Sequence, residues 1–426
     1  MNEHDSAPPQ PALRRRKLAI AGIAGNVLEW YDFAVYGYFA PVLAQLFFPS
    51  QDPTVSLIAA YGAFAAGFVM RPLGALFFGH IGDRYGRKTA LVCSIALMAV
   101  SSLAIGILPT YEQIGIAASV LMVVIRLFQG AAVGGEFTTS VVYLAEIAPD
   151  NRRGFFASWA MSGSSGGILL GSLAGAVLSY LLSDAQLNDW GWRIPFLFGV
   201  MVAVSAYFLR RTMIDVQAPK RLDFPLGHMI RHHWRGVLHV FCLSAGFAVA
   251  YYIGFLYVSG WLVSQMHESH AEALTFNSIS IATMVVLVPF IARASDRIGR
   301  KPVMVTGAAL ILIIAHPMAW MMTHPDPLYA LAGQLAFALG VAIFMAPLPV
   351  AFAEMFPANI RVTAVSAGYN LALAVFGGTA PMLATWLDGY TGDRTSFAWY
   401  VTGIGVMTLI GALLLKETLK KPFEKG

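Results

Sequence analysis

Charged residues are scarce in this chain. Only 12% of its 426 residues are Asp, Glu, Lys or Arg, about half the share in soluble domains, and 57% are hydrophobic. So few charges do not cover the surface of a soluble protein of this length. Cysteine is scarcer still: Cys93 and Cys242 both lie inside apolar runs, which argues against a disulfide and favours packing roles for both.

The chain also lacks the patterns of catalysis. The Ser/Gly-rich run 162–167 has no flanking strand pattern and no Gly-Lys-Ser/Thr ending, so it does not predict a nucleotide site. His232 and His233 have no further ligands at metal-site spacing, and neither have His267 and His270. No nucleophile set has supporting spacing. We therefore expect neither an enzyme nor a protein with a bound metal or cofactor.

Long apolar runs are abundant, and mean hydropathy is +0.65. Runs of this length cross roughly 30 Å of hydrocarbon as helices, whereas barrel strands alternate over about ten residues. The sequence therefore predicts an all-α polytopic membrane protein with twelve transmembrane helices. The predicted spans are 19–47, 55–79, 89–108, 112–146, 154–182, 192–209, 236–264, 272–292, 302–322, 327–353, 362–387 and 396–415.

Positive charge lies on one side of these spans. All but four of the 28 Lys and Arg residues fall on a single face, the exceptions being Arg71, Arg126, Arg193 and Arg394. The positive-inside bias then places both termini in the cytoplasm. The expected location is the cell inner (cytoplasmic) membrane. The basic pI of about 9.1 follows from this loop bias, so it does not indicate nucleic-acid binding.

Two motifs occur twice. Gly79–Lys88 ends in Asp-Arg-x-Gly-Arg-Lys, and Asp296–Lys301 repeats that pattern 213 residues later. Glu146–Arg153 is echoed by Glu354–Arg361 at an offset of 208. Two motifs at nearly one offset indicate a duplicated chain, hence two pseudo-symmetric six-helix bundles.

The polar stretch between the repeats sets the expected domain boundaries. We expect an N-terminal bundle over 1–210, a cytoplasmic linker over 211–235 and a C-terminal bundle over 236–426. Nothing in the sequence indicates a second subunit, and we expect a monomer.

Five charged residues fall inside spans of the first half. They are Glu29, Asp32, Arg71, Arg126 and Glu136. Such residues are costly in a membrane and face a cavity or a partner. Arg126 and Glu136 are about 15 Å apart along one helix, so they do not pair. We hypothesise that one of the three acids carries a proton, with Arg71 or Arg126 as counter-ion or substrate anchor; a structural ion pair is the alternative.

Small residues and prolines also mark the spans. Gly67 and Gly74 in span 2 permit close helix packing, and Gly130 and Gly134 in span 4 permit close approach or bending. Two prolines in 347–349 predict a break or kink in span 10.

Polar and aromatic residues near the predicted centre are candidates for substrate binding. The set is Tyr36, Arg126, Gln129, Tyr251, Tyr252 and Asn370.

The duplicated motifs supply a candidate cytoplasmic gate, whose charges would latch the two halves together. Its residues are Asp83, Arg84, Arg87, Glu146, Arg153, Asp296, Arg297, Glu354 and Arg361. The alternative is that these charges only anchor topology.

The chain resembles the major facilitator superfamily through the Gly79–Lys88 loop motif and its echo. It is similar to the metabolite:proton symporter family through Gly25-Asn-x-x-Glu-Trp-Tyr-Asp-Phe, Phe68-Val-Met-Arg-Pro-Leu-Gly, Arg126-Leu-Phe-Gln-Gly and Trp190-Gly-Trp-Arg-Ile-Pro-Phe. That resemblance implies proton-coupled transport of a metabolite such as α-ketoglutarate, citrate, shikimate, an aromatic acid, proline or a betaine.

The expected function is therefore proton symport, importing a small mono-, di- or tricarboxylate by alternating access. Two buried arginines favour the acid. A zwitterionic osmolyte, proline or betaine, is the alternative, and proton-driven export is a further one. A channel fits the spans but not the duplicated latch motifs. The expected partners are the substrate, protons and the lipid bilayer.

Overall fold

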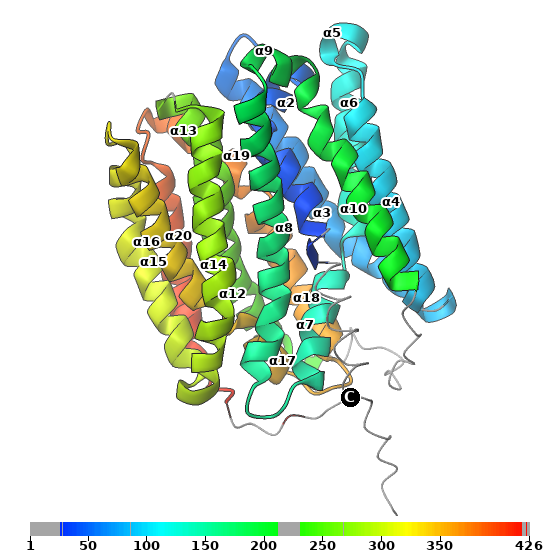
Figure 1. The fold of residues 1–426 in the computed structure, drawn as a ribbon. Coiled ribbons are helices and arrows are strands. Elements are labelled where there is room, and N and C mark those ends of the chain that lie inside the picture. Colours follow the sequence, from blue (N-terminus) through cyan, green and yellow to red (C-terminus); the bar gives the residue numbers. More distant parts are fainter. Residues whose placement is uncertain are drawn as a thin grey trace, which may run out of the picture.

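The computed structural model describes residues 26–27, 29–85, 87–211, 231–266, 268–419 and 423. Within these ranges the chain is helical and contains no strand. Nine helices in the described part of the chain are long and apolar enough to cross a membrane. Residues 29–47, α4 and α10 supply three more apolar helical segments, so the predicted twelve-helix fold is confirmed (Figure 1).

The first bundle is built from six of these spans. They are residues 29–38 with α2 (Ala40–Phe47), α3 (Pro53–Tyr85), α4 (Arg87–Ile107), α6 (Ile116–Ala132) with α7 (Glu136–Ile147), α8 (Arg153–Leu181) and α10 (Arg193–Arg211). The short helices α5 (Tyr111–Ile114) and α9 (Asp184–Gln186) and the π turn η1 (Leu187–Gly191) lie at the end of the bundle shown uppermost in Figure 1.

The second bundle has the same number of spans, two of which contain π turns. They are α12 (Trp234–Tyr252) continuing through η2 (Ile253–Tyr257) into α13 (Val258–Met266), α14 (His270–Ile298), α15 (Arg300–Met322), α16 (Pro327–Met345) with α17 (Leu348–Glu354), α18 (Arg361–Ala372) continuing through η3 (Leu373–Gly377) to α19 (Ala380–Thr391), and α20 (Phe397–Leu414).

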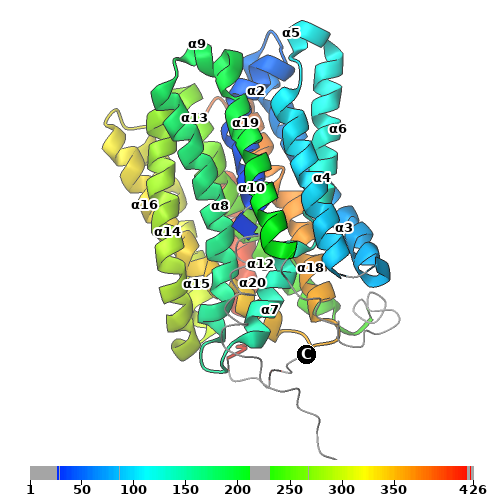
Figure 2. The same cartoon turned by 45° about the vertical axis from the view of Figure 1, so that its right-hand side comes forward.

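The two bundles lie side by side, with α8 and α14 running along each other between them (Figures 1 and 2). Helices α15, α16 and α20 form one flank, and α4 and α10 form part of the other. The starts of α8 and α15 and the ends of α7, α14 and α17 meet at one end, named here the latch end. The opposite end carries α2, α9 and α13.

Glycine allows α3 to lie directly against α6, as the sequence predicts. A Cβ atom on Gly130 would stand 1.8 Å from the carbonyl oxygen of Gly67, and one on Gly74 would stand 1.9 Å from that of Ala131. A Cβ atom on Gly134 would likewise stand 2.2 Å from the carbonyl oxygen of Arg71. Only residues without a side chain permit backbones this close.

The loop motifs are tighter turns than their length indicates. Helix α3 continues to Tyr85 and α4 begins at Arg87, so most of the 79–88 motif is helical. In the second copy, α14 ends at Ile298 and α15 begins at Arg300, with Gly299 alone between them at φ +113°. That backbone region favours glycine, which explains the residue there.

The break predicted from the two prolines is present. Helix α16 ends at Met345, Pro347 stands at the N-cap of α17, and Pro349 follows inside its first turn. The predicted linker lies mostly outside the described residues, and the domain boundaries derived from it stay a prediction.

Candidate functional site

The first buried charge pair joins the opening helix to α3. Arg71 Nη2 lies 3.0 Å from Glu29 Oε1, and both side chains are almost fully buried. The Arg71 guanidinium also lies over the rings of Trp30, Phe33 and Phe68, at 5.1–5.6 Å from their centroids. Aromatic faces stabilise a cation in such places. Of the three acids considered from the sequence, the structure pairs Arg71 with Glu29.

Among the described side chains, no carboxylate forms an ion pair with Arg126, which instead begins a chain of hydrogen bonds. Its Nη1 donates to Gln129 Oε1 at 2.5 Å, and Gln129 Nε2 donates to Ser102 Oγ at 3.2 Å. Ser102 Oγ in turn donates to Asp32 Oδ2 at 2.7 Å. The arginine and the aspartate are therefore linked through an amide and a hydroxyl, in a region where every member is buried.

Two atoms of the Arg126 guanidinium stay unused. Neither Nε nor Nη2 has a hydrogen-bond partner among the described residues, although the side chain is 0% exposed. The group lies over Tyr36 at 4.4 Å, Phe33 at 4.7 Å and Phe64 at 5.4 Å. Buried donors without partners are costly, and here they present a positive, planar fork suited to a carboxylate.

Asp32 packs closely against α10. Its Oδ1 would be 2.3 Å from a Cβ on residue 199, so α10 approaches it only because that residue is Gly199. Oδ1 has no hydrogen-bond partner among the described residues. Asp32 thus faces α4 and α10, inside the first bundle.

A small central cavity lies between the bundles. It is lined by Trp30, Phe33, Ala34, Ile168, Tyr251, Tyr252 and Leu256. Phe33 both lines this cavity and lies beneath the two guanidinium groups. The hydroxyls of Tyr251 and Tyr252 have no hydrogen-bond partner among the described residues. The cavity is therefore walled by aromatic faces with a guanidinium behind one of them.

The other predicted substrate residues point elsewhere. Tyr36 donates to the Ala60 carbonyl at 3.1 Å, and Gln129 belongs to the chain that leads to Asp32. Asn370 donates to the Gly134 carbonyl at 2.7 Å and so bridges the two bundles at the break between α6 and α7. Glu136 begins α7, but its side chain lies outside the described part of the structure. A substrate role for Tyr36, Gln129 and Asn370 stays a prediction, as does a proton-coupling role for Glu136.

At the latch end, the duplicated motifs pair with each other. Arg153 of the first bundle lies 3.1 Å from Glu354 of the second, and Arg361 of the second lies 2.5 Å from Glu146 of the first. The arginine of each motif thus pairs with the glutamate of the other motif, across the interface between the bundles. Glu354, Arg153 and Arg361 are nearly buried, which separates this network from ordinary surface pairs.

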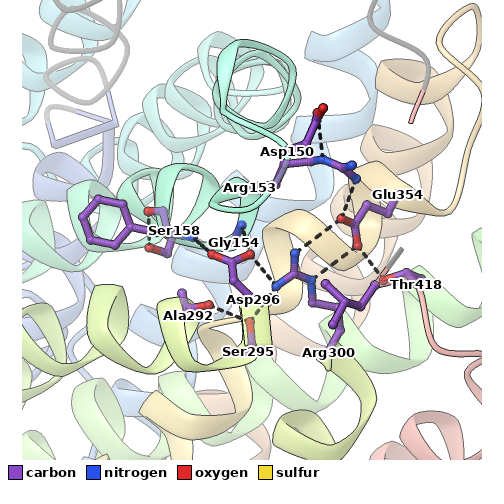
Figure 3. Close-up of polar contacts among 12 residues, drawn as sticks. Asp150, Arg153, Gly154, Ser158, Ala292, Ser295, Asp296, Arg300, Glu354 and Thr418 are labelled. Atoms are coloured by element: carbon purple, nitrogen blue, oxygen red, sulfur yellow. Dashed lines mark hydrogen bonds and ion pairs between the residues drawn. The ribbon is translucent and has the colours of Figure 1, made fainter. Parts of the chain in front are cut away.

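Arg300 and Asp296 extend the network (Figure 3). Arg300 Nη1 lies 2.7 Å from Asp296 Oδ1, and Arg300 Nε lies 3.4 Å from Glu354 Oε2. Asp296 also accepts the backbone N–H groups of Gly154 and Phe155, at 2.8 and 3.0 Å. It therefore holds the first turn of α8 from across the interface, where the helix N-terminus favours an anion. We name Glu146, Arg153, Asp296, Arg300, Glu354 and Arg361 the latch.

The gate stays a prediction, and the latch contains five of the residues that were predicted for it. Arg297 is exposed and forms no ion pair with a described residue, whereas Arg300, three residues on in the same motif, makes those contacts. Arg84 is exposed over the ring of Tyr85. The side chains of Asp83 and Arg87 lie outside the described part of the chain.

The segment after α20 also joins the latch, which the sequence did not indicate. Thr418 donates to Glu354 Oε2 at 2.6 Å. Glu417 accepts the backbone N–H groups of Arg300 and Lys301 at 3.0 Å each and so caps α15. Phe423 lies beneath the guanidinium groups of Arg153 and Arg361, at 4.8 and 4.1 Å.

Two duplicated helical bundles, a closed charged interface and buried charges in the first bundle define a membrane transporter. Residues 17–214 match the sugar (and other) transporter family, and residues 251–425 match the major facilitator superfamily. The chain is a multi-pass membrane protein that belongs to the major facilitator superfamily.

Its relatives include the metabolite permeases that the motifs resemble. The α-ketoglutarate permease of Escherichia coli (strain K12) is 36% identical over 419 residues, covering 96% of each chain. The proline/betaine transporter of the same organism is 33% identical over 426 residues, covering 96% of this chain and 85% of that relative. A solved structure of the proton:xylose symporter XylE superposes with a TM-score of 0.79 at 19% identity over 97% of this chain and 98% of that one, a likeness of fold alone.

Proposed function

We propose that this protein is a proton symporter that imports a small organic acid across the bacterial inner membrane by alternating access. The observation that carries the substrate class is the buried Arg126 guanidinium, whose Nε and Nη2 have no hydrogen-bond partner among the described residues. A substrate carboxylate would supply two acceptors to that fork. The 36% identity to an α-ketoglutarate permease supports the same class.

Proton coupling in this proposal uses the chain from Arg126 to Asp32. A carboxylate at this depth is stabilised as an anion by donors and cations nearby. A substrate carboxylate bound to Arg126 neutralises its positive charge. The arginine then stabilises the Asp32 anion less through the chain of Gln129 and Ser102. Asp32 then takes a proton, so both species cross together. Glu29 and Glu136 are the other candidate carriers, and Glu29 is already paired with Arg71.

The orientation and the gate complete the proposal. The positive-inside bias assigns the latch end and both termini to the cytoplasm. The latch then closes the cytoplasmic side, and its pairs separate when the bundles rock open there. We propose that a monomer performs the whole cycle.

Transport by purified protein in proteoliposomes tests the function. Labelled α-ketoglutarate is presented with an inward proton gradient while an enclosed dye reports internal pH. We expect accumulation above the external concentration, with acidification inside that depends on substrate. Accumulation without substrate-dependent acidification refutes symport, and proton entry coupled to substrate exit indicates an exporter.

The central cavity favours a second candidate, a zwitterion such as a betaine or proline. Trp30, Phe33, Tyr251 and Tyr252 line it, and aromatic walls of this kind bind quaternary ammonium groups. Arg126 would hold the single carboxylate. The 33% identity to a proline/betaine transporter agrees with this alternative. Glycine betaine and proline in the same assay decide between the two, because only the true substrate drives acidification.

A further inference from the structure

A cluster of uncharged polar side chains joins the two bundles between the cavity and the end opposite the latch. Asn277 Nδ2 donates to Ser172 Oγ at 3.1 Å, and Ser278 Oγ lies 2.9 Å from the same oxygen. Ser172 Oγ also donates to the Leu274 carbonyl at 3.1 Å. Ser172 is on α8 of the first bundle and the others are on α14 of the second, so one hydroxyl makes every cross-bundle contact in this set.

The cluster continues into the second bundle through Gln334. Its Nε2 donates to Asn277 Oδ1 at 3.1 Å and to the Gly254 carbonyl at 3.0 Å. We name Ser172, Asn277, Ser278 and Gln334 the amide clasp. All four residues are at most 5% exposed, so water does not replace a lost partner while this end stays closed.

The Gly254 carbonyl is available because of the π turn η2. In an α-helix the Val258 N–H would donate to residue 254, but here it donates to Ile253, five residues back. Gln334 supplies the missing donor. Gly254 lies between Tyr252 and Leu256, which both line the central cavity, so the amide of Gln334 fixes the turn that carries one cavity wall.

We propose that the amide clasp holds the end opposite the latch closed and that Asn277 and Gln334 are positioning residues for the cavity. When the bundles separate at that end, Ser172 leaves with the first bundle and Asn277 loses its acceptor. The same movement frees the Asn277–Gln334 pair to relax, and with it the turn at Gly254. Opening of this end and reshaping of the cavity wall are thus one event.

The test uses a cysteine reporter and needs no substrate. Leu256→Cys is placed in a chain whose Cys93 and Cys242 are replaced by Ser and Ala, and a membrane-impermeant maleimide is added to each face of sealed vesicles in turn. Ser172→Val and Ser172→Thr introduce side chains of nearly the same size, but only threonine keeps the hydroxyl. We expect Val to raise the labelling rate about fivefold over Thr, only from the face opposite the latch, because Val removes the hydroxyl that contacts Asn277, Ser278 and the Leu274 carbonyl.

Controls keep the outcome decisive. Ser244→Ala removes a buried hydroxyl that has no partner among the described residues, and it should leave labelling unchanged. Ser278→Ala, a milder change, should act in the same direction as Val if the Val variant folds poorly. Equal labelling of the Val and Thr variants, or equal increases from both faces, overturns the clasp.

The positioning role has a separate readout. Gln334→Leu is combined with Ser172→Val, and the labelling rates of the two singles and the double are compared. One continuous network predicts that the double is no faster than the faster single, because the first break has already released the rest. If the labelling rate of the double variant rises by the product of the two single increases, the substitutions cause independent packing defects. That result would refute the role of Gln334.

Discussion

Arg71 and Glu29 form an ion pair 3.0 Å long in which the side chains are 1% and 3% exposed. Removing one member of such a pair leaves the other charge buried and uncompensated, which costs about 3–5 kcal/mol. We therefore expect Glu29→Gln to lower the thermal unfolding temperature of the purified protein markedly. The double variant with Arg71→Met should recover much of the loss, and wild-type stability in the single variant would contradict the pairing.

Asp32 and Glu136 are the acids to test for proton coupling. Asp32→Asn preserves size and can still accept from Ser102, but it binds no transported proton. Accumulation should fall to the level reached without a pH gradient, while exchange of internal for external substrate continues. Glu136→Gln is measured in parallel. Full proton-driven accumulation by both variants would remove the proposed carriers.

Glu354 joins three parts of the latch end, since Arg153, Arg300 and Thr418 all contact its carboxylate. Glu354→Gln should shift the balance towards the latch-open form and raise maleimide labelling of Ala145→Cys from the latch face about tenfold. Asp150 is the matched control. It lies 3.7 Å from Arg153 but is 72% exposed, so Asp150→Asn should change the rate less than twofold.

Gly130 and Gly135 make a second matched comparison. A Cβ atom at Gly130 would stand 1.8 Å from the Gly67 carbonyl oxygen, whereas one at Gly135 would meet nothing within 4 Å. Gly130→Ala should therefore separate α3 from α6 and destabilise the protein by about 3 kcal/mol or more. Gly135→Ala should behave as wild type. Size-exclusion profiles and unfolding temperatures measure both, and equal tolerance would contradict the packing.

Glu417 predicts a pH-dependent contact outside the membrane. Partial burial acts to raise the pKa of its carboxyl, but hydrogen bonds from the backbone N–H groups of Leu419, Arg300, Lys301 and Thr418 outweigh it and hold the pKa below its ordinary value. A lowered pKa means that the docked carboxylate contributes stability above the ordinary Glu pKa of about 4.3 and loses it as pH falls through the lowered value.

The Glu417→Gln variant isolates that contribution. Its unfolding temperature should lie below that of the wild type near neutral pH, and the two should converge as the wild-type carboxyl protonates. A difference that persists at the lowest pH would mean that shape, not charge, holds the segment.

The sequence predicted the fold because hydrophobic length and motif duplication are local or linear signals. Runs long enough to span a bilayer identify helices, and two repeated motifs identify two bundles. The 347–349 prolines predicted a break for the same reason, since a proline acts on its own helix. Glu146, Arg153, Glu354 and Arg361 were also predictable, because equivalent residues of duplicated halves meet at the interface between them.

The rest depends on which helix faces which. Nothing in the sequence pairs Arg71 with Glu29 rather than with Asp32, because both acids lie within one turn of the same helix. Ser102 and Gly199 belong to no motif that the sequence analysis identified, yet they contact Asp32 directly. Arg300 belongs to the Asp296–Lys301 motif, as Arg297 does. Only the turn at Gly299 decides that Arg300 faces the latch while Arg297 faces solvent.

The reciprocal exchange at the latch follows from the duplication itself. A motif that carries both an acid and a base seven residues apart, as Glu146 with Arg153 and Glu354 with Arg361 do, is complementary to a rotated copy of itself. One short motif, used twice, therefore supplies both members of both ion pairs across the interface.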